Sequence, residues 1–381
     1  MKLKDIAKVQ GGYAFKSDSF ISGETPIIRI GNIVNNEVVI DNEITAPIST
    51  IGGRKEFLIN KNDILIAMSG ATVGKVGIYN YNYPSMLNQR VGNIKSDSKY
   101  QKYIYYLLQS PLFKKYVELS SFGCAQPNIS GAQIENFEFK EIAIEEISKI
   151  VSELDKVTSL INIRKKEIEN CNNLIKSQFV EMFGDIKHNV KGFEIIKLED
   201  YTNMITYGLT VRPKYIECGI PLISATEIKT GDIDYKLAKK ISLEDYESLS
   251  EKAKLSKGDM LFGKVGASIG YCAIVSNDEK IAITQNIARL ILKDNVNQLW
   301  LKGFLTSDEI QDWCQREAKG NAMKDLQINT IRNMPIFKCD IELQNKFAQI
   351  VEQIDKQKFE FEKSLKKLEK LQASLMQEYF G

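Results

Sequence analysis

Few residues of this chain have the types and spacing that enzymatic chemistry requires. Residues 70–75 (GATVGK) are similar to a phosphate-binding loop, but three residues separate the glycines where that loop has four, and Val76 follows the lysine where Ser or Thr is needed. A second copy of the stretch has Tyr271 in place of the lysine. We therefore interpret the stretch as a turn between two strands, because glycine tolerates a positive φ angle.

The usual groups of nucleophilic and metal chemistry are scarce. His188 is the only histidine and lies in a predicted linker, so serine or cysteine catalysis would depend on that one base. The six cysteines lie far apart without a Cys-x-x-Cys pair, which argues against a metal site and indicates free thiols in a reducing cytosol. The Asn/Asp-Pro-Pro-Tyr tetrapeptide of adenine methyltransferases does not occur. We expect no catalytic residue, no metal and no cofactor in this chain.

The sequence repeats itself at an offset of 196 residues. Residues 63–65 (DIL) and 70–74 (GATVG) return as 259–261 (DML) and 266–270 (GASIG), and Gln89 maps onto Gln285. Each copy ends in a helical pattern closed by Phe-Gly. Solenoid repeats have periods of about 20 to 50 residues, so this longer period indicates two whole domains.

Both copies have mixed helical and strand patterns. Short apolar runs bounded by Gly, Asn and Asp predict strands at 26–30, 63–68, 221–223 and 259–262. Apolar residues near helical spacing predict a helix from Tyr100 to about Leu119, and a counterpart from Trp300 to Cys314. We expect an α+β fold with two mixed α/β domains in tandem, each followed by a long helix.

Apolar residues recur at every seventh position in the segments that close the two copies. The heptad positions are Ile147, Leu154, Ile161, Ile168 and Ile175 in the first segment, and Phe347, Ile354, Phe361, Leu368 and Leu375 in the second. Rows of this length predict that the two helices pair as a coiled coil, and polar residues beside the row would set its register. Two ordinary surface helices are the alternative.

Composition places the chain among soluble globular proteins, with 43% hydrophobic and 26% charged residues. The net charge of +2 means that binding to DNA would rely on local basic patches and on another chain. No apolar run has the length of a membrane span, and the start shows no signal peptide. We expect a cytoplasmic protein without a membrane partner.

The chain resembles the specificity subunits of Type I restriction-modification systems over essentially its whole length. The first copy contributes residues 2–7 (KLKDIA), 11–16 (GGYAFK), 26–33, 69–75 (SGATVGK), 88–90 (NQR) and 126–130 (QPNIS), together with the duplicated helices. The second copy differs from the first at 263–266 (GKVG) and 320–326 (GNAMKDL). Such differences are expected if the two copies bind the two different halves of one DNA site.

The resemblance implies target-recognition domains at residues 1–142 and 185–340, with spacer helices at 143–184 and 341–381 that pack antiparallel. Each domain would bind half of a split, asymmetric sequence in double-stranded DNA, and helix length would set the gap. Two methyltransferase (modification) subunits would bind S-adenosylmethionine and methylate adenine N6. Restriction/translocase subunits would use ATP and Mg. This chain would be a non-catalytic specificity subunit.

Base contacts in the major groove favour Arg and Lys for guanine and Asn and Gln for adenine. Within this interpretation we predict DNA-binding residues in or beside loops: Lys16, Arg29, Asn32, Arg54, Lys55, Gln89 and Arg90 in the first domain, and Tyr207, Arg212, Lys214, Lys264, Gln285, Asn286, Lys319 and Lys324 in the second. Gln89 and Gln285 could equally be structural, because they occupy the same place in both copies. The alternative function is a coiled-coil protein–protein adaptor without DNA recognition.

Overall fold

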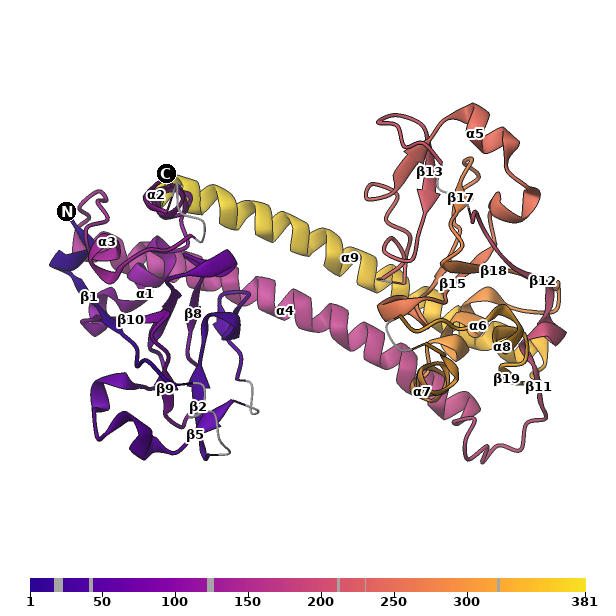
Figure 1. Cartoon of the computed structure of the whole chain (residues 1–381), viewed down its shortest axis with the longest axis horizontal. Coiled ribbons are helices and arrows are strands. Elements are labelled where there is room, and N and C mark those ends of the chain that lie inside the picture. The colour runs from indigo at the N-terminus through magenta and orange to yellow at the C-terminus, as the bar shows by residue number, and fades with distance from the viewer. Residues whose placement is uncertain (17–22, 41–43, 122–126, 211–212, 230, 321–322) are drawn as a thin grey trace. The chain divides into compact units, whose positions relative to one another are not determined.

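The computed structural model of this chain describes residues 1–16, 23–40, 44–121, 127–210, 213–229, 231–320 and 323–381 (Figure 1). The chain divides into two compact units, Met1–Lys165 with Lys363–Gly381, and Lys166–Glu362. Each unit contains one domain and parts of both long helices. Both units mix helices and sheets, so the α+β fold expected from the sequence is confirmed.

The first unit is built on two sheets. The six-stranded sheet has the order β1 (Ala7–Gly11), β10 (Val91–Ser96), β7 (Ile64–Ala67), β8 (Val76–Ile78), β4 (Glu37–Val38) and β3 (Ile33–Val34). The four-stranded sheet has the order β5 (Thr45–Ala46), β2 (Thr25–Ile28), β9 (Ser85–Leu87) and β6 (Leu58–Ile59). In the four-stranded sheet β2 and β9 run parallel, so the segments that follow these two strands begin at the same end of the sheet.

The second unit repeats this layout with fewer strands. One sheet has the order β12 (Thr202–Tyr207), β18 (Ile287–Leu292), β15 (Met260–Gly263) and β16 (Cys272–Ile274). Another has the order β14 (Lys239–Ile241), β13 (Ile220–Ile223) and β17 (Ala282–Ile283), and a third pairs β11 (Ile195–Lys197) with β19 (Pro335–Phe337). Strands β13 and β17 run parallel, as β2 and β9 do. The strands predicted in both copies are therefore present.

The prediction of one continuous helix before each spacer was wrong in both copies. The first copy has α1 (Ser98–Leu107) and α2 (Pro111–Ser120), and the second has α6 (Gln298–Leu305) and α7 (Asp308–Glu317). Pro111 cannot continue a helix, and the Ser110 hydroxyl caps α2 by accepting from the Phe113 amide at 3.1 Å. In the second copy Ser307 adopts an extended backbone at the start of α7. The shorter helices are α3 (Gly131–Glu135), α5 (Leu243–Ser248) and α8 (Ile328–Arg332).

The glycine stretch is a turn between two strands, as predicted. Gly70 and Gly74 have φ angles of 76° and 80° between β7 and β8. Gly266 and Gly270 repeat this with 62° and 89° between β15 and β16. A side chain at Gly270 would also collide with Gln311, since a Cβ atom there would lie 2.1 Å from the Gln311 Oε1 atom.

The long helices α4 (Ile144–Phe183) and α9 (Ile341–Phe380) each contain 40 residues. In the first unit their contacts run antiparallel: Tyr379 donates to Glu153, Gln372 Nε2 donates to Thr158 Oγ1 at 2.9 Å, and Arg164 Nε donates to Ser364 at 3.2 Å. In the second unit Lys358 donates to Asn172 at 2.8 Å, and the Phe179 and Phe347 rings lie 5.4 Å apart. The expected antiparallel pairing is therefore present.

The ends of these helices belong to the domain cores. Ile147 and Leu154 are buried in the core of the first unit together with Phe380, and Leu375 packs against it. Phe347 is buried in the core of the second unit, where Ile175 packs against it. Ile161 and Ile354 are also buried, whereas Ile168, Phe361 and Leu368 are partly exposed. Within the described residues, no helix combines the length and apolar character that crossing a membrane needs.

Candidate nucleic-acid interface

In the first unit, loop segments meet at one edge of the sheets. Tyr13 forms a backbone bridge with Asn88, and the Gln89 amide donates to the Tyr13 carbonyl at 2.8 Å. The Met68 amide donates to the Arg90 carbonyl at 2.9 Å. Gln89 and Arg90 are exposed, and neither side chain makes a hydrogen bond or ion pair within the described residues. Gln89 and Arg90, both predicted to bind DNA, thus have unpaired side chains on a backbone that hydrogen bonds hold in place.

Arg29 and Asn32 lie beside this edge, and they differ in whether their side chains are already hydrogen-bonded. Arg29 follows β2 and is exposed, and the parallel register with β9 places it abreast of Asn88. The Asn32 carboxamide is engaged in its own turn: Oδ1 accepts from the Arg29 amide at 2.8 Å, and Nδ2 donates to the Val39 carbonyl at 2.9 Å. Asn32 therefore shapes the loop that carries Arg29.

Arg54 is held in place by aromatic rings. Its guanidinium carbon lies 4.8 Å from the centre of the Tyr13 ring and 5.1 Å from that of Phe57. Its Nε atom donates to the Ile51 carbonyl at 3.1 Å. Such cation–π contacts orient a cation at little entropic cost on binding. Lys16 and Lys55 are exposed.

The second unit builds the same edge from equivalent segments. Leu209 bridges Thr284, the Gln285 amide donates to the Leu209 carbonyl at 2.9 Å, and the Lys264 amide donates to the Asn286 carbonyl at 3.1 Å. A hollow of about 450 Å³ opens there. Four predicted residues line it, namely Tyr207, Lys264, Gln285 and Asn286, together with Asp325, Gln327 and Asn329, which the sequence did not indicate.

Lys264 differs from the exposed cation that we predicted. Its residue surface is only 9% exposed, and its ammonium group pairs with the Asp325 carboxylate, which also accepts from Gln327 Nε2 at 2.7 Å. Its charge is therefore balanced inside the protein. The bridge between Val265 and Asp325 brings the partners together from distant parts of the chain, so no local sequence signal marked them.

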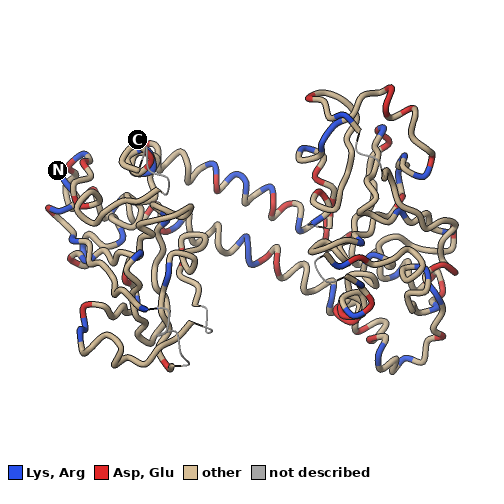
Figure 2. Tube along the Cα trace, in the orientation of Figure 1, with Lys and Arg blue, Asp and Glu red and all other residues tan. Residues whose placement is uncertain are grey.

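The other predicted residues of the second unit lie around this edge or cannot be placed. Lys214, Lys319 and Lys324 are exposed, and Lys319 bonds through its backbone to Asp325. Arg212 lies outside the described residues. Figure 2 shows Lys and Arg interspersed with Asp and Glu along both units, in agreement with the net charge of +2.

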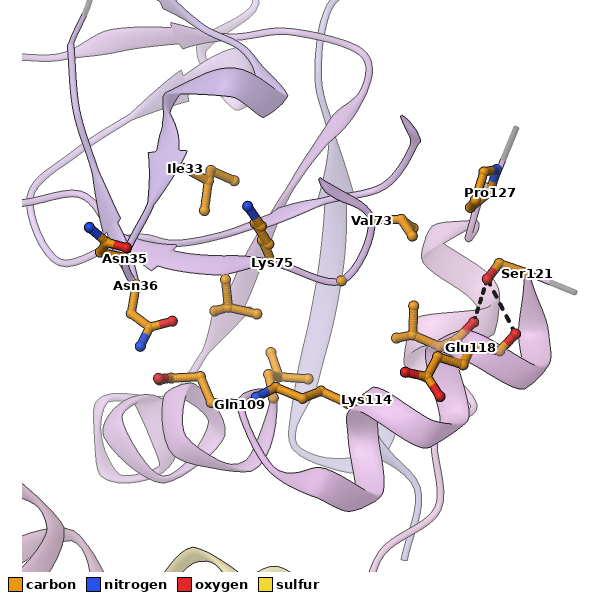
Figure 3. Close-up of a pocket in the computed structure, with 14 residues that line it drawn as sticks. Ile33, Asn35, Asn36, Val73, Lys75, Gln109, Lys114, Glu118, Ser121 and Pro127 are labelled. Carbon is orange, nitrogen blue, oxygen red and sulfur yellow. Dashed lines mark hydrogen bonds between the residues drawn. The ribbon is translucent and has the colours of Figure 1, made fainter. Parts of the chain in front are cut away.

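The first unit also has a hollow of about 800 Å³ away from these residues (Figure 3). Its lining includes Asn36, Lys75, Gln109, Lys114 and Glu118, and none of the predicted DNA-binding residues. Gly74 of the glycine turn lies at this hollow. In the second unit the Gln311 side chain donates to the carbonyl of the equivalent Gly270 at 3.1 Å. The hollow therefore lies apart from the edge that carries the predicted DNA-binding residues.

Comparison with known proteins accounts for the duplicated architecture. The family described as Type I restriction modification DNA specificity domain matches residues 1–170 and 190–373. The chain belongs to this family. It is 22% identical over 386 residues to the Type I restriction enzyme EcoBI specificity subunit of Escherichia coli, a match that covers 93% of this chain and 78% of that protein.

One further specificity subunit and one solved structure are similar to this chain. The MjaIX specificity subunit of Methanocaldococcus jannaschii is 24% identical over 408 residues, which cover 98% of this chain and 90% of that one. The solved Type I restriction-modification S subunit from M. genitalium has a TM-score of 0.55 at 16% identity and covers 100% of this chain and 95% of its own. The resemblance drawn from the sequence is confirmed, and the solved structure shares the fold.

Proposed function

We propose that this chain is the DNA sequence-specificity subunit of a Type I restriction-modification complex. One observation carries the proposal: a single backbone arrangement occurs twice, with Gln89 and Arg90 exposed on one copy, and Gln285 exposed and Asn286 partly exposed on the other. Phosphate contacts position a protein on DNA, whereas side chains on base edges specify the sequence. Each domain would bind one half of a bipartite, asymmetric site in double-stranded DNA, and α4 and α9 would set the gap.

The chemical steps would belong to partner subunits. Two modification subunits would bind S-adenosylmethionine and methylate adenine N6 in each half-site, and restriction subunits would use ATP and Mg. This chain would hold no cofactor and perform no catalysis. Two features support that division: the net charge of +2 leaves much of the phosphate binding to other chains, and His188 is exposed, with its ring nitrogen 2.9 Å from Asp185.

A genome-wide map of N6-methyladenine in the native host, with and without this gene, tests the proposal. Deletion should abolish methylation at one bipartite, asymmetric motif and leave other motifs intact. Restoring the gene on a plasmid should restore the same motif. A map that does not change on deletion would contradict the proposal and favour the coiled-coil adaptor, to which the comparisons give no support.

A further inference from the structure

Arg90 and Asn286 occupy equivalent places in the two domains. Each follows a glutamine whose amide is bonded to the preceding loop, at 2.8 Å for Gln89 and 2.9 Å for Gln285. The carbonyl oxygens of Arg90 and Asn286 accept from the amides of Met68 and Lys264 at 2.9 Å and 3.1 Å. The strands β10 and β18 begin at the next residue in each copy. The backbone is therefore fixed on both sides of each residue in the same way.

Only the side chains distinguish the two places. Arg90 is exposed and Asn286 lies partly exposed at the rim of the 450 Å³ hollow. In the part of the chain that the structure describes, neither side chain has a hydrogen-bond or ion-pair partner. A free polar side chain on a rigid backbone is the arrangement expected of a group that contacts a ligand. The preceding glutamine is shared, so it cannot make the two domains differ.

The surroundings preserve the chemical contrast. In the second domain Lys264 lines the same hollow as Asn286, and its ammonium group is paired with Asp325. The Asn286 carboxamide is neutral and can both donate and accept a hydrogen bond. In the first domain Met68 takes the place of Lys264, and Arg90 keeps an unpaired guanidinium.

We propose that Arg90 and Asn286 determine sequence specificity at one equivalent base pair of each half-site, with Arg90 selecting guanine and Asn286 selecting adenine. The inference rests on the proposed function. A guanidinium donates two hydrogen bonds to guanine O6 and N7, whereas a carboxamide accepts from adenine N6 and donates to N7. One such bidentate contact discriminates against the wrong base on the order of ten- to a hundred-fold.

Exchange of the two residues provides the test, because each variant carries a side chain that the other copy already accommodates. The variants Arg90→Asn and Asn286→Arg replace the native gene in the host, and N6-methyladenine is mapped across the genome. Arg90→Asn should change one position of the first half-site from guanine to adenine, with a shift in relative methylation on the order of ten-fold or more. Asn286→Arg should make the reverse change in the second half-site. The other half-site and the gap should stay as they are.

Two further variants separate base selection by Arg90 from an effect of its charge alone and from the loss of any surface cation. Arg90→Lys keeps the charge but loses the planar fork, so it should relax discrimination at the same guanine. Lys140→Asn removes an exposed cation elsewhere in the first unit and should leave the motif unchanged. If Arg90→Asn lowers methylation uniformly, or if neither exchange alters a base, the inference is overturned. An unchanged map on deletion of the gene would instead overturn the proposed function itself.

Discussion

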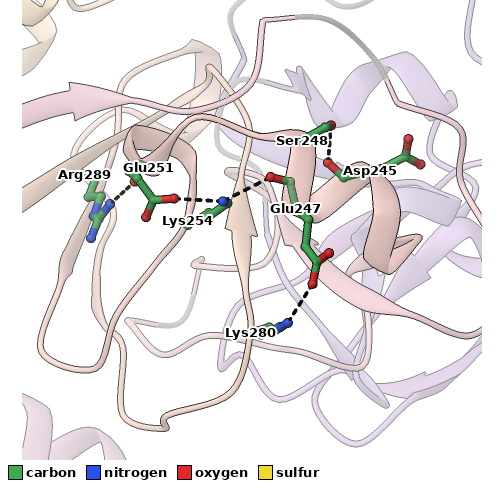
Figure 4. A network of polar contacts seen from close by, with 7 residues as sticks. All are labelled: Asp245, Glu247, Ser248, Glu251, Lys254, Lys280 and Arg289. Atoms are coloured by element: carbon green, nitrogen blue, oxygen red, sulfur yellow. Dashed lines mark hydrogen bonds and ion pairs between the residues drawn. The ribbon is translucent and has the colours of Figure 1, made fainter.

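Asp259 and Arg289 form a buried ion pair with 2.7 Å between Oδ2 and Nη2, at the place where Asp63 accepts from Asn93 in the first domain. Both carboxylates also accept from a backbone amide three residues earlier. Arg289 further donates from Nη1 to the Glu251 carbonyl at 2.7 Å, next to the Lys254–Glu251 and Lys280–Glu247 pairs (Figure 4). In the first domain Lys95 also pairs with Asp63 at 2.8 Å, so both domains fasten the same turn to the same strand, one through an amide and a half-exposed lysine and the other through a buried arginine.

Replacing Arg289 with Ala should destabilise the second unit by about 3 to 5 kcal/mol, because it leaves the buried Asp259 carboxylate without its charged partner. The two tryptophans, Trp300 and Trp313, both lie in this unit. Urea unfolding followed by tryptophan fluorescence therefore reports its stability in the full chain. Arg316→Ala, which removes an exposed arginine of the same unit, is the control. Equal midpoints for the two variants would show that the ion pair contributes nothing.

Lys264→Met should leave the salt dependence of DNA binding unchanged, although Lys264 lies at the candidate interface. Its charge is balanced by Asp325, so it releases no counterion from DNA. Lys319→Met, at an exposed cation of the same edge, should lower the slope of log K against log salt by about one if Lys319 contacts a phosphate. The measurement is binding by the assembled complex over a range of salt. A slope that falls with Lys264→Met would mean that the lysine leaves Asp325 to contact DNA.

Thiol reactivity should follow burial. Cys218 is exposed, whereas Cys272 and Cys314 are buried, and burial raises the pKa of each of these two thiols to about 12. The thiolate is the reactive form, so at pH 8 the two buried cysteines should hardly react. Iodoacetamide labelling followed by mass spectrometry should find Cys218 modified in the native protein, and Cys272 and Cys314 only after denaturation. Rapid native labelling of Cys272 would contradict the burial described.

Local patterns predicted much of the architecture. The strands at 63–68 and 259–262 and both long helices follow from periodicity, which a few neighbouring residues determine. The break between α1 and α2 could also have been found, because Ser110 followed by Pro111 is a signal for the start of a helix. The pairing of Lys264 with Asp325 had no such signal, since it depends on a bridge between segments about 60 residues apart. Arg90 was proposed from its residue type alone, and only the structure showed that it is exposed and has no side-chain partner among the described residues.

Replacing Phe380 with Ala should destabilise the first unit by about 3 to 5 kcal/mol, because it creates a cavity in a core built mainly by residues from the other end of the chain. Phe380 is 4% exposed, and its ring lies 5.5 Å from that of Tyr103. Amide hydrogen exchange in β10 should accelerate, while exchange in β15 of the second unit should not. Leu371→Ala, at an exposed position of the same helix, is the control and should leave β10 protected. Unchanged exchange in β10 of the Phe380 variant would mean that α9 serves only to pair with α4. Faster exchange would show that the heptad helix also completes a recognition domain, which explains why its last turn is aromatic.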